Sequence, residues 1–256
     1  MSASPRYSLL QLDPQLGQLL PRGRLAEAQS ALGVRVARLP RGKWDTDGIV
    51  DGRSEHVGLL VLEGVVAHDV LMDGQASTEL LGPGDLLRPW TREPAPLLRR
   101  GVRWHVLSDT RAALLDRQFA WQLGGWPEVN AMLMERLSER TERLAATLAI
   151  TKLTRVDRRV LAFLWHLAER WGRMTPGGVL LPLTLSHRML GQIVGARRPT
   201  VTAAVSALVE AGEIVRRADG AWLLTSESRL AAMDGDRDGE PAPLVAPRRH
   251  VLVGRD

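Results

Sequence analysis

The sequence of 256 residues contains no cysteine. This absence excludes a disulfide framework, a thiolate zinc site, an all-cysteine iron–sulfur cluster and a cysteine nucleophile. The chain also has no apolar run that approaches the roughly 18 residues of a membrane-spanning helix. Its first residues do not show the basic segment and apolar segment of a secretory signal. We therefore expect a cytoplasmic protein with no membrane partner.

Motifs of common enzyme classes are missing as well. The sequence has neither the Gly-x-Ser-x-Gly nucleophile elbow nor a Gly-rich Walker loop. Three histidines of the first half, His56, His68 and His105, lack the closely spaced His-x-His pattern with a nearby glutamate that cupin metal sites use. We expect no catalytic residues, no metal site and no enzymatic activity.

Lysine is almost absent, because Lys43 and Lys152 are the only two among 34 basic residues. A general bias toward arginine would make any single arginine cluster ordinary. The net charge of +5 is nevertheless uneven, since residues 152–229 hold 12 Lys/Arg against 6 Asp/Glu. A compact basic segment suits a polyanion-binding domain, because phosphate neutralisation supplies most of the nonspecific affinity for nucleic acid.

The stretch from Val34 to Phe119 predicts many short strands. Apolar and polar residues alternate near its start and end, and turns are expected at Glu63-Gly64, Asp73-Gly74 and Gly82-Pro83-Gly84-Asp85. Asp-Gly is a strong signal for a two-residue hairpin. Regular turns between short strands favour an antiparallel sandwich or small barrel, with short helical pieces from residues 13–32 packed against it.

A change of period then predicts a helix from Pro127 to about Thr151. This segment has no internal Gly or Pro, and a proline suits the first helical turn. Its leucines recur at spacings of 4, 7 and 4, at Leu133, Leu137, Leu144 and Leu148. The seam could pack on the same chain, but coiled-coil pairing with an identical helix fits so narrow a seam better. We expect a homodimer joined along these leucines.

Beyond the long helix the helical pattern continues in shorter units. Apolar faces predict helices that end near Gly172, Gly195 and Gly212, and a hairpin that turns at Asp219-Gly220 follows. Helix, helix, glycine turn, helix and hairpin is the order of a winged helix-turn-helix. Periodicity then disappears, and residues 227–256 are expected to form a flexible tail.

The segment from Leu185 to Leu208 carries the functional prediction. Gly195 permits a sharp turn between two helices, and Pro199 suits the first turn of the second one. An arginine at the start of a recognition helix can bond a guanine in the major groove, and hydroxyls suit phosphates or base edges. The candidate side chains near or on that helix are Arg197, Arg198, Thr200, Thr202 and Ser206. A plain three-helix bundle with a solvated basic face is the alternative.

Residues 30–225, approximately, resemble the cyclic-AMP receptor protein / fumarate-nitrate regulator (Crp/Fnr) family of bacterial transcription factors. The most specific matches are Gly191-Gln-Ile-Val-Gly195 and Arg198-x-Thr200-Val201, and Gly82-Pro-Gly-Asp85 matches the family's glycine turn. The resemblance implies an α+β fold with three parts. These are an N-terminal antiparallel β-roll of the cyclic-nucleotide-binding, jelly-roll type (1–125), a long dimerisation helix (126–152) and a C-terminal winged helix-turn-helix (153–226).

By the same resemblance, Arg198 takes the place of the guanine-reading arginine. The preceding helix would touch the DNA backbone through Ser186, His187 and Arg188. Two positions depart from the family, because Pro199 replaces a common glutamate and Ala203 replaces a second arginine. The preferred half-site is therefore expected to differ from the best-known family operator. The expected partners are double-stranded DNA with a pseudo-palindromic site, a second copy of the chain and, for an activator, RNA polymerase.

The β-roll departs further from the members that bind cyclic AMP. Their Gly-Glu pair for the ribose falls at Arg88-Pro89, and their Arg-Ser/Thr pair for the phosphate falls at Val102-Arg103. Ordinary cyclic-AMP binding is therefore not expected. Arginines and flat rings could hold another anionic nucleotide, such as a cyclic dinucleotide, by charge pairing and stacking. The candidate effector residues are Arg88, Trp90, Arg92, Arg99, Arg100, Arg103 and Trp104, with an exposed arginine-rich loop as the alternative.

The leading hypothesis is a homodimeric, sequence-specific DNA-binding transcription regulator whose roll senses an effector and sets the arrangement of two recognition helices. A β-roll that binds a small molecule, or a metal-dependent cupin-like enzyme, could instead carry a basic helical tail. That alternative predicts ligand binding or turnover by residues 1–125 alone. A nonspecific architectural protein is the third hypothesis, and it predicts equal affinity for scrambled duplexes.

Overall fold

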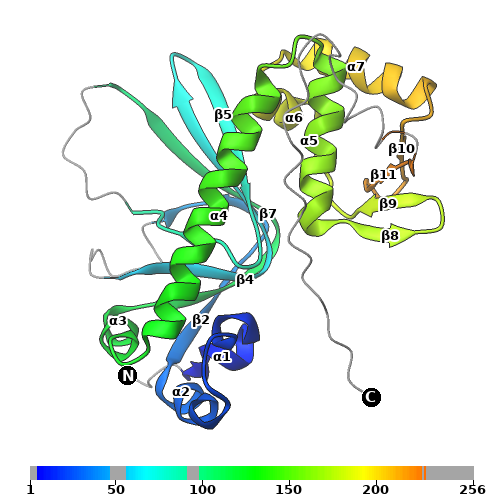
Figure 1. Ribbon diagram of the computed structural model, residues 1–256. Coiled ribbons are helices and arrows are strands. Elements are labelled where there is room, and N and C mark those ends of the chain that lie inside the picture. Colours follow the sequence, from blue (N-terminus) through cyan, green and yellow to red (C-terminus); the bar gives the residue numbers. More distant parts are fainter. Residues whose placement is uncertain (1–4, 47–55, 91–97, 227, 229–256) are drawn as a thin grey trace.

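The computed structural model describes residues 5–46, 56–90, 98–226 and 228. Figure 1 shows a domain of strands, a long helix lying along it, and a smaller helical domain with short strands of its own. The candidate effector residue Arg92, and the tail predicted for residues 227–256 apart from Ser228, lie outside the described residues. Within the described ranges, no helix is both long and apolar enough to cross a membrane.

The first domain is an antiparallel roll built on one seven-stranded sheet. Its strands are β1 (Tyr7–Ser8), β2 (Gly33–Leu39), β3 (Gly42–Trp44), β4 (Gly58–Met72), β5 (Gln75–Leu81), β6 (Leu86–Leu87) and β7 (Gly101–Leu115). β4 and β7 form the long central pair, β2 and β5 flank it, and all pairings are antiparallel. The expected β-roll is confirmed.

One predicted turn of the roll is confirmed and another is wrong. Asp73-Gly74 closes β4 onto β5 with φ values of 47° and 74°, the positive values that a tight hairpin requires. Glu63-Gly64 is not a turn, because β4 runs through it and only shifts its pairing with β7. Gly64 has a φ of 88°, and a Cβ there would lie 2.3 Å from the Thr110 hydroxyl oxygen. Its glycine therefore serves a β-bulge inside one continuous strand.

Short helices cover one end of the roll. They are α1 (Leu9–Leu12), the 3-10 turns η1 (Pro14–Gly17) and η2 (Arg22–Arg24), α2 (Leu25–Ala31) and α3 (Arg117–Leu123). Their apolar side chains form one buried cluster with the sheet, in which Leu16 and Phe119 are fully buried. The helical pieces predicted for residues 13–32 are thus present. A second buried cluster lies within the sheet, where the rings of Trp44 and Trp104 meet edge to face at 5.7 Å.

The long helix α4 (Pro127–Thr151) begins and ends where the sequence predicts. Three of its arginines, spaced four and three residues apart, bind carboxylates of the roll domain: Arg136 binds Asp13, Arg140 binds Glu79 and Arg143 binds Asp85. We call these three the arginine ladder. Charged hydrogen bonds of this kind are short and directional, so the ladder fixes α4 along the roll.

The C-terminal domain has the order of a winged helix-turn-helix, as predicted. Its elements are α5 (Val156–Trp171), β8 (Arg173–Thr175), β9 (Gly178–Leu181), α6 (His187–Val194), α7 (Arg198–Glu210), β10 (Ile214–Arg216) and β11 (Trp222–Leu224). The sequence did not predict the β8–β9 hairpin, which extends the wing into a four-stranded sheet of order β10-β11-β9-β8. Trp222 is fully buried between this sheet and the helices.

The predicted glycine turn, Gly82 to Asp85, is where the two domains meet. The Arg170 guanidinium, near the end of α5, donates a hydrogen bond to the Pro83 carbonyl at 2.8 Å. A Cβ at Gly82 would lie 2.6 Å from the Trp171 ring, so only glycine lets α5 approach this closely. α6 also packs on β5, which places the helix-turn-helix beside the β4–β5 hairpin (Figure 1).

Candidate nucleic-acid interface and effector cavity

Two glycines shape the turn between α6 and α7. Gly195 ends α6 in the left-handed conformation, with a φ of 67° and a ψ of 42°. The amide of Ala196 then donates to the Gly191 carbonyl at 2.9 Å. A Cβ at Gly191 would lie 2.5 Å from the Ala196 carbonyl oxygen, so this position needs a glycine. The turn holds α6 and α7 in the helix-turn-helix arrangement that the sequence predicts.

The helix α7 presents one apolar face and one polar face. Val201, Val205 and Leu208 are buried against α5 and α6. The side chains predicted to contact DNA are all exposed: Arg197, Arg198, Thr200, Thr202 and Ser206. Arg197 is the N-cap and Arg198 the first residue, followed by Pro199 in the first turn. The structure therefore gathers these predicted side chains at the start and along the solvent face of one helix.

The predicted backbone contacts lie at the start of α6. Ser186 caps this helix by accepting the Met189 amide at 3.1 Å, and Arg188 is exposed. The Nδ1 of His187 lies 2.9 Å from the Thr202 hydroxyl, which itself donates to the Arg198 carbonyl. Since one hydroxyl hydrogen serves that carbonyl, Nδ1 is the donor to Thr202. Burial, and then the charges of Arg216 and Arg198, lower the pKa of His187.

Sequence reasoning missed Arg216 on the wing. Its side chain lies with Ser186, His187, Arg188 and Arg198 around a hollow of about 660 Å³. The sequence shows two adjacent arginines at 216 and 217, and alternation along a strand sends only one of them toward this hollow. The strand register needed to choose between them comes from the fold.

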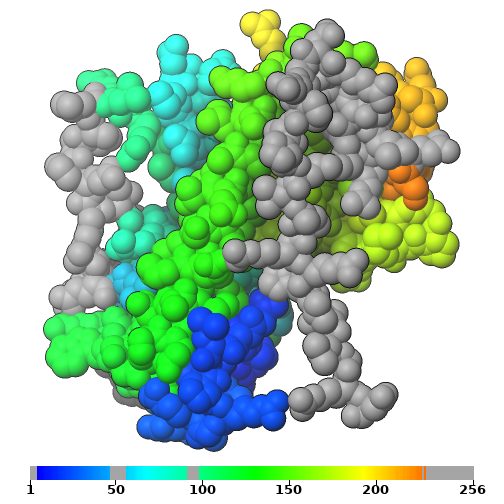
Figure 2. Space-filling model, in the orientation of Figure 1, coloured from blue at the N-terminus to red at the C-terminus, as the bar shows by residue number. Residues whose placement is uncertain are grey.

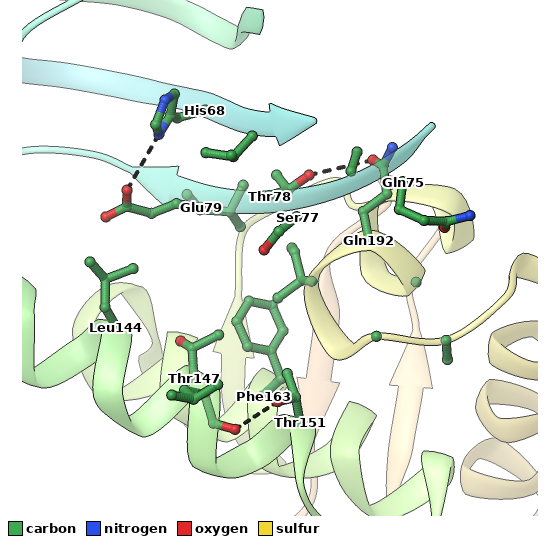
Figure 3. A pocket seen from close by; sticks show the side chains of 18 of the residues that line it. His68, Gln75, Ser77, Thr78, Glu79, Leu144, Thr147, Thr151, Phe163 and Gln192 are labelled. Atoms are coloured by element: carbon green, nitrogen blue, oxygen red, sulfur yellow. Dashed lines mark hydrogen bonds and ion pairs between the residues drawn. The ribbon is translucent and has the colours of Figure 1, made fainter. Parts of the chain in front are cut away.

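A larger cavity of about 1150 Å³ lies between the β4–β5 hairpin, α4, α5 and α6 (Figure 3). Thr78 and Glu79 line it from β5, Thr147 from α4, Phe163 from α5 and Gln192 from α6. The Thr78 hydroxyl donates to Asp69 at 2.6 Å and lies 3.4 Å from the Gln192 side-chain oxygen. The cavity thus spans the joint between the roll and the helix-turn-helix.

Carboxylates of the roll already pair with some arginines of this cavity, whereas Arg188, Arg197 and Arg198 line it from the helix-turn-helix. Arg140 forms a bidentate pair with Glu79, with both N–O distances at 2.7 Å. Burial raises the pKa of Glu79, but hydrogen bonds from His68 and Arg140 lower it more, so the net pKa lies below the ordinary value of 4.5. Arg103 pairs with Asp69 at 3.3 Å. An anionic ligand would therefore have to compete with these carboxylates for Arg140 and Arg103.

The predicted effector residues that the structure describes do not gather at this cavity. Among these six, Arg103 alone lines it. Trp104 is buried and stacks on His68 with ring centroids 4.2 Å apart, so it supports the cavity wall from behind. Arg88, Arg99 and Arg100 are exposed and Trp90 is half-buried, and none of these four lines the cavity. The residues that do line it come mainly from the hairpin and from α4, α5 and α6, which sequence alignment on the family motifs did not indicate.

The predicted dimer seam is wrong at Leu133. Leu133 is 2% exposed and packs with Leu137 against the roll, so it is not available to a second helix. Leu144 and Leu148 are 44% and 61% exposed and line the cavity mouth. A second stripe of α4, which shares only Leu148 with the predicted seam, faces solvent at spacings of 4, 3, 4 and 3: Met134, Ser138, Thr141, Ala145 and Leu148. We call this the outer stripe; Figure 2 shows α4 at the surface.

Metal-binding side chains do not gather in the described part of the chain: no group of three or more His, Asp or Glu residues there could hold an ion. The three histidines His56, His68 and His105 take part in separate contacts. His56 meets Trp90, His68 pairs with Glu79, and His105 lies 4.0 Å from Asp69.

The chain is similar to one domain family and to several known proteins. Residues 158–233 match the Crp-like helix-turn-helix domain family. A CRP-like cAMP-activated global transcriptional regulator of Mycobacterium tuberculosis is 29% identical over 158 residues, which cover 60% of this chain and 67% of that protein. A CooA variant from Carboxydothermus hydrogenoformans has a TM-score of 0.62 at 20% identity, covering 87% and 94% of the two chains. The c-di-GMP responsive global regulator CLP of Xanthomonas campestris has a TM-score of 0.54 at 17% identity, covering 75% and 94%.

Proposed function

The chain belongs to the Crp/Fnr family of bacterial transcription regulators, and we propose that it acts as a homodimer that reads a pseudo-palindromic DNA site with α7. The observation that carries the proposal is the exposed polar face of α7. This helix begins with Arg198, directly after the glycine-shaped turn of the helix-turn-helix. An arginine at this position of a recognition helix can bond a guanine through O6 and N7.

The other polar side chains divide by position. Thr200, Thr202 and Ser206 lie further along the solvent face of α7, where hydroxyls suit base edges or phosphates. Ser186 and Arg188 lie at the start of α6, which in helix-turn-helix proteins crosses the DNA backbone. We assign the α7 side chains to base readout and the α6 side chains to positioning.

We assign the dimer interface to the outer stripe of α4. Its 4-3-4-3 spacing is that of a coiled-coil seam, and small residues in its middle allow two helices to approach closely. Two copies joined in this way would place two recognition helices on half-sites about 34 Å apart, one turn of duplex. The resulting site is pseudo-palindromic because the dimer has two-fold symmetry.

We assign the effector site to the cavity between the hairpin, α4, α5 and α6, and its ligand class to anionic nucleotides. The support is its size, its position at the domain joint and its arginines, which a phosphate could take over from Glu79 and Asp69. The relatives named for cAMP and for c-di-GMP make both ligands useful probes. Arg88 and Pro89 do not line this cavity, so titration with both nucleotides has to decide between them.

Selection of genomic DNA fragments by the purified full-length protein tests the function. We expect the enriched fragments to share an inverted repeat, and binding to that repeat to be at least 10³-fold tighter than to a scrambled duplex. Calorimetric titration with cAMP and c-di-GMP, in parallel, tests the effector assignment. An enriched set without a common sequence would contradict a sequence-specific regulator and favour an architectural protein.

A further inference from the structure

We propose that Arg216 of β10, together with Arg188 of α6, forms a seat for one backbone phosphate of duplex DNA, beside the base-reading Arg198. The seat is the hollow of about 660 Å³ where α6, α7 and the wing meet. The inference rests on the proposed DNA binding and adds to it a wing residue that fixes the duplex against the recognition helix.

The composition of the hollow favours an anion. One arginine comes from each of the three elements that surround it, and His187 adds a polar ring. The remaining lining residues are Leu185, Ser186 and Val205, so no carboxylate of the described chain lines the hollow. The large cavity differs in this respect, because Glu79 lies on its wall and neutralises Arg140. The three arginines of the hollow leave a net positive charge for a ligand to neutralise.

Arg216 is held in place before any ligand arrives. Its guanidinium lies 4.2 Å from the centre of the Trp222 ring, and its Nη1 donates to the Leu185 carbonyl at 3.2 Å. Both Trp222 and Leu185 are fully buried, so these two anchors belong to the rigid core of the domain. The bond to Leu185 uses one of the five N–H groups of an arginine. A fixed guanidinium loses less side-chain entropy when it binds a phosphate.

The charges in the hollow act on the imidazole of His187. Burial lowers the pKa of His187 first, and the positive charges of Arg216 and Arg198 lower it further. Two arginines from different elements are therefore close enough to one imidazole to disfavour its protonation. A phosphate placed among them would relieve this mutual repulsion, which makes the site selective for an anion over a neutral ligand.

Duplex DNA is the source of phosphate that the position favours. The hollow borders Arg198, the first residue of the recognition helix, and opens beside the exposed face of α7. A backbone phosphate between Arg188 and Arg216 would bring the edge of the major groove to Arg198. Free inorganic phosphate shares the same chemistry, so the experiment has to separate the two sources.

The test measures DNA affinity of the full chain against salt concentration for wild type, Arg216→Ala and Arg217→Ala. Arg217 is the matched control, because it is the next residue and is also exposed, but it pairs with Asp219 at 3.7 Å and does not line the hollow. Loss of one phosphate contact should reduce the steepness of the plot of log affinity against log salt concentration by about 0.9. The corresponding loss of affinity near 0.15 M salt is roughly fivefold. Arg216→Ala should show this loss equally on specific and scrambled duplexes, and Arg217→Ala should not.

Two further measurements separate charge from packing at Arg216 and DNA from free phosphate. Arg216→Lys keeps the charge and should retain most of the salt slope, whereas a purely structural role of the stack on Trp222 predicts that lysine fails like alanine. Inorganic phosphate should compete no better than chloride at equal ionic strength. If phosphate displaces DNA from wild type but not from Arg216→Ala, free phosphate is the ligand and the assignment to DNA is wrong. Salt-independent or absent DNA binding by wild type would contradict the proposed function itself; an unchanged slope in Arg216→Ala alone would contradict only the seat.

Discussion

Asp85 of the roll and Arg170 of the DNA-binding domain form a direct ion pair, with Oδ2 and Nη1 2.7 Å apart. The other carboxylate oxygen of Asp85 binds Arg143 of α4. The Asp85 side chain is 1% exposed, so a single buried carboxylate ties together the roll, the long helix and the second domain. Burial lowers the pKa of Arg143, and Asp85 opposes this effect while Arg170 adds to it, which shows how closely the two guanidinium groups are crowded around one charge.

Replacement of Asp85 by asparagine should therefore destabilise the protein. The substitution keeps the shape of the side chain but removes the one carboxylate with which both guanidinium groups pair, at a cost of about 3 kcal/mol or more. Urea unfolding measures the change. Glu139→Gln is the control, because Glu139 is half-exposed and lies 4.0 Å from Arg143, where an ion pair contributes little. Equal stability of the two variants would show that Asp85 does not hold the domains together.

Gly82→Ala should loosen the same joint by steric means. The added Cβ would meet the Trp171 ring at 2.6 Å, and relief of such an overlap costs about 1–3 kcal/mol. We expect a lower temperature of thermal unfolding and a changed Trp171 environment in fluorescence. Gly23→Ala serves as the control, since nothing lies within 4 Å of a Cβ at that position. A Gly82 variant as stable as the Gly23 variant would mean that α5 does not pack on the turn as described.

Arg198→Ala should weaken binding to the selected DNA site by about 1–3 kcal/mol and relax the base preference at one position of each half-site. Arg188→Ala should instead lower the affinity for all duplexes by a similar factor and reduce the salt slope by about one unit. Competition binding with single-base variants of the site separates the two effects. Retention of the full base preference by Arg198→Ala would show that another side chain reads that base.

The stability of the roll should depend on the charge of Glu79 at acidic pH. Because the net folded pKa of Glu79 lies below the ordinary value of 4.5, its stabilising contribution is fully present above that pH. The contribution is lost as the pH falls through the lowered folded value. The difference in unfolding free energy between wild type and Glu79→Gln should therefore be largest near neutral pH and shrink as the pH falls below the ordinary value of 4.5. A difference that stays constant over this range would mean that Glu79 does not act through its charge.

A charge placed on the outer stripe of α4 should separate the dimer. In Ala145→Glu, two carboxylates would face each other in a buried seam, at a cost of about 3 kcal/mol or more. Light scattering should then report a monomer at concentrations where wild type is dimeric, and DNA affinity should fall. Ala26→Glu, on the exposed side of α2, adds the same charge away from the stripe. An Ala145 variant that remains dimeric would place the interface elsewhere.

The order of elements could be predicted from the sequence because local signals specify it. Asp73-Gly74 fixes a hairpin through the positive φ of both residues, and the run without Gly or Pro after Pro127 fixes a long helix. The turn predicted at Glu63-Gly64 is wrong for a related reason. A glycine with positive φ serves a turn or a bulge equally well, and only the pairing of β4 with β7 decides between them.

The helix seam and the effector cavity could not be predicted in this way. Leucine spacing identifies an apolar face but not the surface that it packs against, and Leu133 packs against the roll. The outer stripe contains Ser138, Thr141 and Ala145, which give a weak apolar signal. The cavity is built from four elements distant in sequence, so no single motif contains its residues. The two helices α6 and α7 could be predicted because their signals all lie within one short segment.

The position of the arginine ladder on α4 has a consequence for how two copies would respond. At about 100° per residue, Arg136, Arg140 and Arg143 point away from the side that carries the outer stripe. A turn of the helix about its own axis therefore cannot break the ladder without shifting the stripe against its neighbour. In the proposed dimer, occupancy of one cavity would therefore change the affinity of the other cavity for the effector.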